Sequence, residues 1–107
     1  MIDAVIYYRG NKHAGFFLRG HAEYAQPGED IVCAAASVLA INTVNSIEKI
    51  AKDEVTVNEI EKDGIIDCKL SENPKELSMA FIESFELGIK DVEAQYGDFI
   101  KVTSKEI

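Results

Sequence analysis

The alternation of hydrophobic and polar positions changes period along the chain, and these changes predict where strands and helices lie. Five segments are short, rich in β-branched or aromatic residues or alternating in polarity, which is typical of strands. These segments are residues 1–8, 15–19, 55–60, 65–70 and 99–102. Residues 10–13 have turn composition, and Lys62-Asp63-Gly64 is an acceptable hairpin turn. The sequence therefore predicts two hairpins and one later strand.

A long apolar segment predicts a central helix from Ile31 to about Lys52, with Asp30 as its N-cap. The first eleven residues, Ile31 to Ile41, contain only one hydroxyl and one thiol as polar groups. A helix that is apolar nearly all round must be covered on most sides. Because a domain of this size has few elements to cover it, we expect a second copy to do so in a homodimer.

A second helix is predicted after residue 73. Asn73 is a suitable cap, Pro74 suits the first helical position, and Glu76 can close a capping box. Apolar residues then recur at helical spacing up to Tyr96, and Gly97 is placed to end the helix. One face of this helix is expected to pack on the sheet.

The resulting order is ββαββαβ, an α+β fold in which a mixed or antiparallel sheet packs against two helices. The 107 residues show no repeat, linker or low-complexity stretch, so residues 1–107 are expected to form one domain. No continuous apolar run approaches the ~18 residues that a membrane span needs, and the start lacks a signal-peptide pattern. We therefore expect a cytoplasmic protein with no membrane partner.

Charge and cysteine content exclude several classes of function. Nineteen acidic against eleven basic residues give a net charge of −8, which argues against direct nucleic-acid binding. The charge either keeps the protein soluble or suits a basic partner. The only two cysteines, Cys33 and Cys68, are not expected to form a disulfide in a reducing compartment, and they lack the spacing of a zinc site. No metal or cofactor is expected.

The two cysteines are predicted to have different roles. Cys68 lies between Ile66 and Leu70 on one face of a strand, where a small sulfur fills space in a core. If Asp30 is the cap, Cys33 is the third residue of the central helix, where free N–H groups and the helix dipole stabilise a thiolate. The alternative for Cys33 is that it is merely buried in a small-residue patch.

His21 ends the second predicted strand and is separated from Cys33 by a loop, so its imidazole is a candidate base for the thiol. The alternative is an ordinary surface or hydrogen-bonded histidine, which is how we interpret His13 in the first turn. Ser37 lies one helical turn after Cys33 and can hydrogen-bond the sulfur or a substrate. Asp30 opposes thiolate formation by its charge, but it is placed either to cap the helix or to orient His21.

Residues 20–22 (Gly-His-Ala) and 28–39 (Gly-Glu-Asp-Ile-Val-Cys-Ala-Ala-Ala-Ser-Val-Leu) together resemble the signature of the Prp family, the bacterial ribosomal-processing cysteine proteases. The resemblance implies a nucleophile at Cys33, a general base at His21, and supporting roles for Gly20, Asp30 and Ser37. It also implies a homodimer that removes a short N-terminal extension from a large-subunit ribosomal protein, number twenty-seven, during ribosome biogenesis.

Family substrates are cut after an aromatic residue in an apolar stretch, so the resemblance further implies an apolar groove. Its candidate walls are Phe16, Phe17, Tyr24 and Ile31, of which Tyr24 and Ile31 are the substrate-binding residues we favour. The alternative is that these residues belong to the core. Two other functions remain open at this point. One is a non-catalytic ribosome-associated binding module, and the other is a thiol-dependent acyl hydrolase of a different substrate.

Overall fold

The elements follow the predicted order ββαββαβ in a computed structural model that describes residues 1–20 and 28–107. The strands are β1 (Ile2–Arg9), β2 (Lys12–Arg19), β3 (Val55–Ile60), β4 (Ile65–Leu70) and β5 (Ile100–Glu106). The helices are α1 (Glu29–Ser46), which continues as the π-helical turn η1 (Ile47–Ala51), and α2 (Glu76–Tyr96). A 3-10 turn, η2 (Glu61–Asp63), joins β3 to β4. The predicted α+β class is confirmed.

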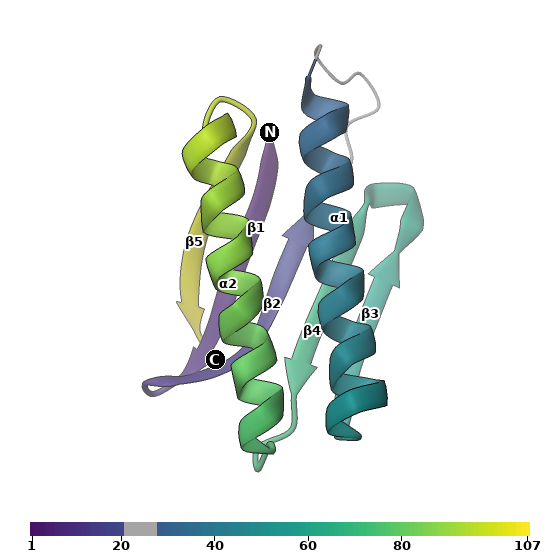
Figure 1. Cartoon of the computed structure of the whole chain (residues 1–107), viewed down its shortest axis with the longest axis vertical. Helices are drawn as coiled ribbons and strands as arrows, with labels where there is room; N and C mark the ends of the chain where they lie inside the picture. Colours follow the sequence, from purple (N-terminus) through teal and green to yellow (C-terminus); the bar gives the residue numbers. More distant parts are fainter. Residues whose placement is uncertain (21–27) are drawn as a thin grey trace.

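The five strands form one mixed sheet in the order β3-β4-β2-β1-β5. Neighbouring strands are antiparallel, except that β5 runs parallel to β1. Both helices lie side by side on the same face of this sheet, α2 over the β1 side and α1 towards β4 and β3 (Figure 1). The chain crosses over from β4 through α2 to β5, which runs parallel to β4 and pairs with β1.

Strand alternation produces the core. Ile2, Ala4 and Ile6 of β1 point towards the helices and are at most 1% exposed. The Phe16 ring in β2 stacks on Phe85 of α2 with ring centroids 4.1 Å apart. Cys68 of β4 is fully buried in the same cluster, so the prediction that it is a packing residue is confirmed.

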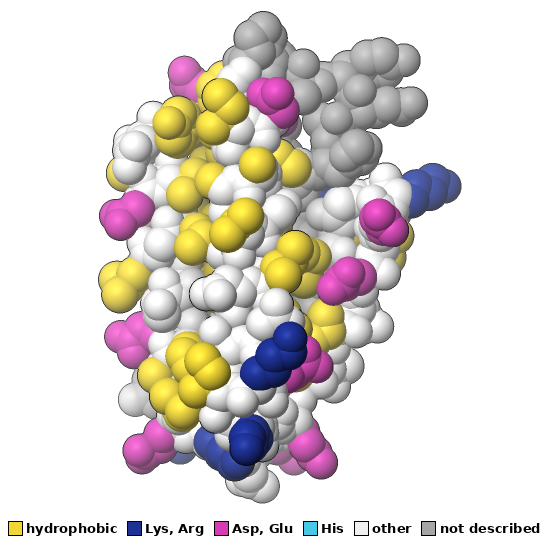
Figure 2. Space-filling model, turned by 45° about the vertical axis from the view of Figure 1, so that its right-hand side comes forward, with side chains coloured by type: hydrophobic (Ala, Val, Ile, Leu, Met, Phe, Trp, Pro, Cys, Tyr) yellow, Lys and Arg dark blue, Asp and Glu magenta, His cyan; other side chains and the backbone are white. Residues whose placement is uncertain are grey.

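Only part of the apolar surface of α1 is covered within the chain. Val32, Ala36 and Ala40 are buried against the sheet, and Leu39 meets α2. The opposite side of the helix remains open, and the large apolar side chains on it that are at least half exposed are Ile31, Val38 and Ile41. Figure 2 shows hydrophobic side chains along this open face. The single chain thus leaves one side of the helix uncovered, and whether a second copy covers it, as expected, stays a prediction.

Within the described residues, the helical segment Glu29–Ala51 is long and apolar enough to cross a membrane by length and composition. The expectation that no continuous apolar run reaches this size is not contradicted, because Ser, Thr and Asn side chains interrupt the apolar residues of this segment. A central helix packed on a sheet passes the same test, so this feature is weak evidence for a membrane span.

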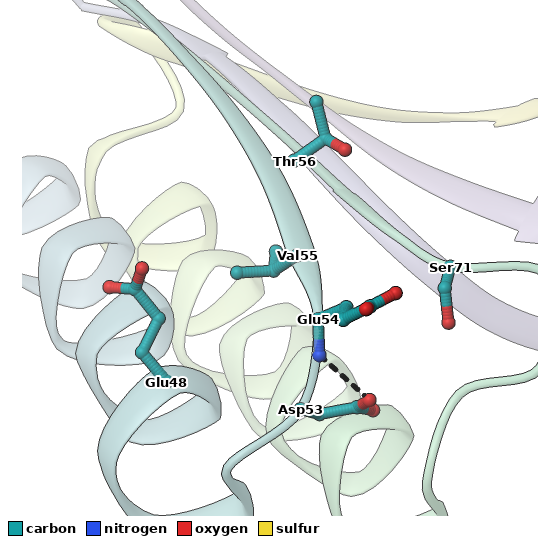
Figure 3. Close-up of a pocket in the computed structure, with 6 residues that line it drawn as sticks. All are labelled: Glu48, Asp53, Glu54, Val55, Thr56 and Ser71. Atoms are coloured by element: carbon teal, nitrogen blue, oxygen red, sulfur yellow. Dashed lines mark hydrogen bonds between the residues drawn. The ribbon is translucent and has the colours of Figure 1, made fainter.

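The second helix begins later than predicted. Its N-cap is the extended residue Lys75 rather than Asn73. The Lys75 backbone N–H and the Ser78 hydroxyl both donate to Asp53 Oδ2, at 2.8 and 2.7 Å. Asp53 Oδ1 also accepts from the Glu54 N–H at 2.8 Å (Figure 3). These hydrogen bonds, led by that from Lys75, lower the pKa of Asp53 below its ordinary value, and they fix where α2 starts.

The first hairpin is tighter than predicted, with β2 beginning at Lys12 instead of residue 15. His13 lies in that strand rather than in the turn, and its Nε2 is 2.8 Å from Glu86 Oε1 on α2. The Tyr8 hydroxyl donates to the other oxygen of the same carboxylate at 2.7 Å. The prediction that His13 is a satisfied histidine holds, although its place in the strand was missed.

Candidate active site

Cys33 lies near the start of α1, two positions deeper than predicted. The helix begins at Glu29 with Gly28 as its N-cap, so Cys33 is the fifth helical residue and Asp30 is the second. The prediction that Asp30 caps the helix is wrong. Gly28 has a φ of 95°, and a side chain is strained in this left-handed conformation. The Asp30 carboxylate is exposed and accepts from the N–H of its neighbour Ile31 at 3.0 Å.

The Cys33 thiol contacts the end of β2. Its Sγ donates to the backbone carbonyl of Gly20, with an Sγ–O distance of 2.7 Å. The Gly20 N–H in turn donates to the carbonyl of Gly64 at 3.0 Å, in the turn between β3 and β4. Gly20 is therefore held on both sides, and the end of β2 is fixed against the half-buried sulfur. Sequence analysis missed Gly64, whose turn composition was visible but whose position opposite β2 depends on strand pairing.

The two halves of the sequence motif thus meet at the Gly20–Cys33 contact. Gly20 directly precedes His21 in the sequence. His21 and Tyr24 lie outside the described residues, so the pairing of His21 with Cys33 and the role of Tyr24 stay predictions. The structure suggests how Gly20 supports the site, because its carbonyl accepts the hydrogen bond of the neutral Cys33 thiol.

Negative charge beside the helix start is partly offset. The Glu29 carboxylate is buried, and its Oε1 is 3.0 Å from the Met1 backbone ammonium. The exposed Asp30 carboxylate interacts with a local backbone N–H, as described above. Asp30 is therefore engaged near the helix start without being its cap, and whether it also orients His21 stays a prediction.

Ser37 is half-buried one turn after Cys33, but the hydrogen bond of the thiol goes to Gly20 and not to Ser37. Ser37 instead lines a groove between α1 and the β3–β4 hairpin. A direct hydrogen bond from Ser37 to the sulfur is thus not formed. Its other predicted role, contact with a substrate group, stays a prediction.

The described residues proposed to form the walls of a substrate groove lie in different parts of the structure. Ile31 is 64% exposed on the first turn of α1, two residues before Cys33, so it is available to a substrate. Phe16 is fully buried against Phe85 and is a core residue. Phe17 points to the other face of the sheet, where the Arg19 guanidinium lies 5.9 Å from its ring centroid. The prediction that Phe16 and Phe17 line the groove is therefore wrong.

Cys68, the second cysteine, is expected to react slowly. Burial, followed by the nearby charge of Asp67, raises the pKa of the Cys68 thiol to about 12. Cys33 is partly accessible, whereas Cys68 is fully buried. Within residues 1–20 and 28–107, no group of three or more His, Cys, Asp or Glu side chains is placed to hold a metal ion. Cys33 is therefore the thiol available for chemistry.

The model of the cysteine protease Prp family matches residues 1–101, so the chain belongs to this family of cysteine proteases. The ribosomal processing cysteine protease Prp of Bacillus subtilis is 27% identical over 96 residues, which is 86% of each chain. The protein of the same name from Staphylococcus aureus is 23% identical over 86 residues, covering 80% of this chain and 81% of that one.

Solved structures share the same fold. The essential ribosomal processing protease Prp from S. aureus, crystallised with a substrate peptide, superposes with a TM-score of 0.91 at 22% identity, covering 98% of this chain and 100% of that one. A crystal structure of a Streptococcus mutans protein has a TM-score of 0.89 at 32% identity, covering 100% of this chain and 96% of the other.

Proposed function

We propose that this protein is a cytoplasmic cysteine endopeptidase that removes a short N-terminal extension from large-subunit ribosomal protein twenty-seven during ribosome biogenesis. One observation carries the proposal. The Cys33 thiol lies at the start of α1 in contact with Gly20, the residue immediately before His21. Membership in the Prp family, whose relatives are named ribosomal processing proteases, supports the choice of substrate.

In the proposed mechanism His21 takes the proton of the Cys33 thiol, and the hydrogen bond to the Gly20 carbonyl is given up. The thiolate attacks the scissile carbonyl carbon. His21 then returns the proton to the leaving amine as the C–N bond breaks, which leaves a thioester on Cys33. Water loses a proton to His21 and attacks the thioester, the C–S bond breaks, and His21 returns this proton to the Cys33 sulfur. The acid product gives its own proton to solvent and leaves as a carboxylate. Each proton taken by His21 is thus returned within the cycle.

Stabilisation of the oxyanion is assigned to backbone N–H groups at the start of α1. In the first turn of α1 the Ile31 N–H donates to the Asp30 carboxylate and the Val32 N–H to the Gly28 carbonyl. An oxyanion would therefore take the earlier N–H groups or replace one of these acceptors. A helical side chain leans towards the N-terminal end. The Cys33 sulfur is therefore directed back towards this turn. Donors fixed in advance at the place where negative charge develops are worth ~10²-fold or more in rate.

The test is incubation with the host's own large-subunit protein twenty-seven, read by intact mass. We expect loss of a short N-terminal peptide at one site, and no loss with the Cys33→Ala protein. An intact substrate after prolonged incubation with folded wild-type protein would refute the proposal. If the two proteins still co-elute in gel filtration, the non-catalytic binding module would be the better description.

A further inference from the structure

A groove with a cavity volume of about 240 Å³ lies between α1 and the β3–β4 hairpin. It is lined by Ser37 and Ile41 of α1, and by Glu59, Glu61, Gly64, Ile65 and Ile66 of the hairpin region. Figure 2 shows this side of the molecule, with hydrophobic side chains along α1 and acidic side chains next to them over the hairpin. Every residue of this lining belongs to the described part of the chain.

The groove is connected to the nucleophile through two short contacts. Gly64, at its wall, accepts the N–H of Gly20 at 3.0 Å, and the Gly20 carbonyl accepts the Cys33 thiol at 2.7 Å. Ser37 lies one helical turn from Cys33 and Ile41 lies two turns away, which corresponds to roughly 6 to 12 Å along the axis. An extended peptide advances ~3.3 Å per residue, so the groove is about two to four residues from the scissile bond.

The lining combines two kinds of chemistry. Ile41, Ile65 and Ile66 offer apolar walls that are not fully buried, while Glu59 and Glu61 place exposed carboxylates at the rim. Neither carboxylate is in an ion pair with any residue that the structure describes. A lysine or arginine side chain matches this arrangement, because its methylene stem packs on apolar surface while its cationic head stays near water.

We propose that this groove is a specificity subsite that binds a Lys or Arg side chain of the substrate, two to four residues from the bond that is cut. The inference rests on the proposed endopeptidase function and adds a selective element to it. Charge complementarity identifies the occupant, because two unpaired carboxylates over an apolar floor favour a basic side chain and repel an acidic one.

The test uses twelve-residue peptides built on the junction sequence of the host's large-subunit protein twenty-seven. Each carries a single Lys, Gln or Glu in turn at positions two to four on either side of the cleaved bond. We expect wild-type kcat/KM to favour Lys over Glu at one of these positions by roughly 1.5- to fivefold, the range for exposed ion pairs. The preference should shrink as salt rises.

The Glu59→Gln/Glu61→Gln protein should lose this preference and cleave the Lys, Gln and Glu peptides at similar rates. Its matched control is Glu48→Gln/Glu54→Gln, which removes the same charge from a separate hollow of about 450 Å³ (Figure 3). The control should keep the preference. An equal Lys preference in both variants, or no such preference in wild type, would overturn the proposal.

Binding separates this inference from the proposed function. The same peptides, labelled with a fluorophore, are titrated against the Cys33→Ala protein, and anisotropy is followed. If wild type cleaves none of them but Cys33→Ala binds the Lys peptides more tightly, and Glu59→Gln/Glu61→Gln removes the difference, the subsite stands and the endopeptidase function falls. If cleavage occurs without any Lys-dependent binding or rate, the subsite falls and the endopeptidase function stands.

Discussion

The Cys33 Sγ and the Gly20 carbonyl oxygen are joined by a hydrogen bond of 2.7 Å, and only a neutral thiol can make it. Gly20, which accepts this hydrogen bond, immediately precedes the candidate base in the sequence. Activation therefore requires exchange of one partner for another, since the sulfur loses its proton and its contact with Gly20 together. This arrangement gives Gly20 a role in the resting state of the site.

The proposed pairing of Cys33 with His21 is tested first by substitution. Cys33→Ala and Cys33→Ser should abolish cleavage of the ribosomal substrate, and His21→Ala should reduce it by ~10²-fold or more, because the thiol then lacks a base. Cys68→Ala should retain most activity and serves as the control. Cleavage is read by mass, and folding by circular dichroism. A folded but inactive Cys68→Ala combined with an active Cys33→Ala would mean that the wrong cysteine has been identified.

Two glycine-to-alanine substitutions should differ in their effect on the free energy of unfolding. A Cβ at residue 20 would lie 3.4 Å from Cys33 Sγ and 3.8 Å from Ile2 Cγ2, so Gly20→Ala fits without a backbone clash. We expect its free energy of unfolding to change by about 1 kcal/mol or less, while alkylation of Cys33 slows several-fold because the methyl group covers one side of the sulfur.

The contrasting change is Gly15→Ala. Its Cβ would lie 2.1 Å from the backbone oxygen of Cys68, at a φ of 150°, so β2 and β4 would have to separate. We expect a loss of about 3 kcal/mol or more in urea denaturation. A Gly15→Ala protein as stable as wild type would contradict the close approach of these two strands.

Thiol labelling should distinguish the two cysteines in the native protein. Cys33 is partly exposed, whereas Cys68 is fully buried and has a pKa raised to about 12 by burial and the Asp67 charge. Iodoacetamide near neutral pH should therefore modify one site, found at Cys33 by peptide mapping, and a second only in denaturant. Cys33→Ala should show no fast label. Rapid native labelling of Cys68 would refute its place in the core.

Glu86 should make stability depend on pH. Burial alone would raise its pKa, but hydrogen bonds from His13, Tyr8 and Lys90 outweigh burial and lower the pKa from 4.5 to about 2. The stabilisation is therefore present above pH ~4.5 and is lost as the pH falls towards 2, by up to about 3 kcal/mol.

Glu86→Gln provides the comparison, since it removes the titrating group and keeps a similar shape. The difference in free energy of unfolding between wild type and Glu86→Gln, measured in urea at pH 7, 4 and 2.5, should shrink at acid pH. A difference that stays constant across this range would show that the carboxylate gains nothing from its three partners.

The open face of α1 leads to a prediction about assembly. Ile31 and Val38 are 64% and 67% exposed, which is unusual for neighbouring apolar residues on a monomer. We expect sedimentation equilibrium at micromolar concentration to give about 24 kDa, twice the chain mass of 11.8 kDa. Val38→Glu should restore the monomer, whereas Leu87→Glu, equally exposed on α2, should not. A clean 11.8 kDa species for wild type would exclude the dimer.

Local pattern predicted the strands best where turn chemistry and alternation agreed. The bounds 55–60 and 65–70 match β3 and β4, because apolar positions alternate on both sides of a turn ending in Gly64. The last strand was predicted too short, at 99–102. Its remainder, Thr103 to Glu106, has no buried residue and is extended because it pairs with β1. Such pairing is a property of the sheet and leaves no local signal.

The site was predictable in its chemistry and less so in its geometry. Residue types and spacing single out Cys33, and the structure leaves it as the accessible thiol of the pair. The helix start was misplaced because Asp30 has a good capping side chain, while Gly28 works through a positive φ that composition does not reveal. The Gly64–Gly20–Cys33 contacts depend on the register of β2 against β4, which only the folded sheet defines.

The parallel pairing of β5 with β1 has a consequence for synthesis on the ribosome. Ile2 is opposite Ile100 and Tyr8 is opposite Glu106. One edge of β1 therefore stays unpaired until β5 has been synthesised. Until then β1 exposes unpaired backbone groups along one side, which invites pairing with another chain. Such distant pairings also slow folding, because a long loop must close before they contribute. A nascent chain of this topology completes its sheet only after β5 has been synthesised.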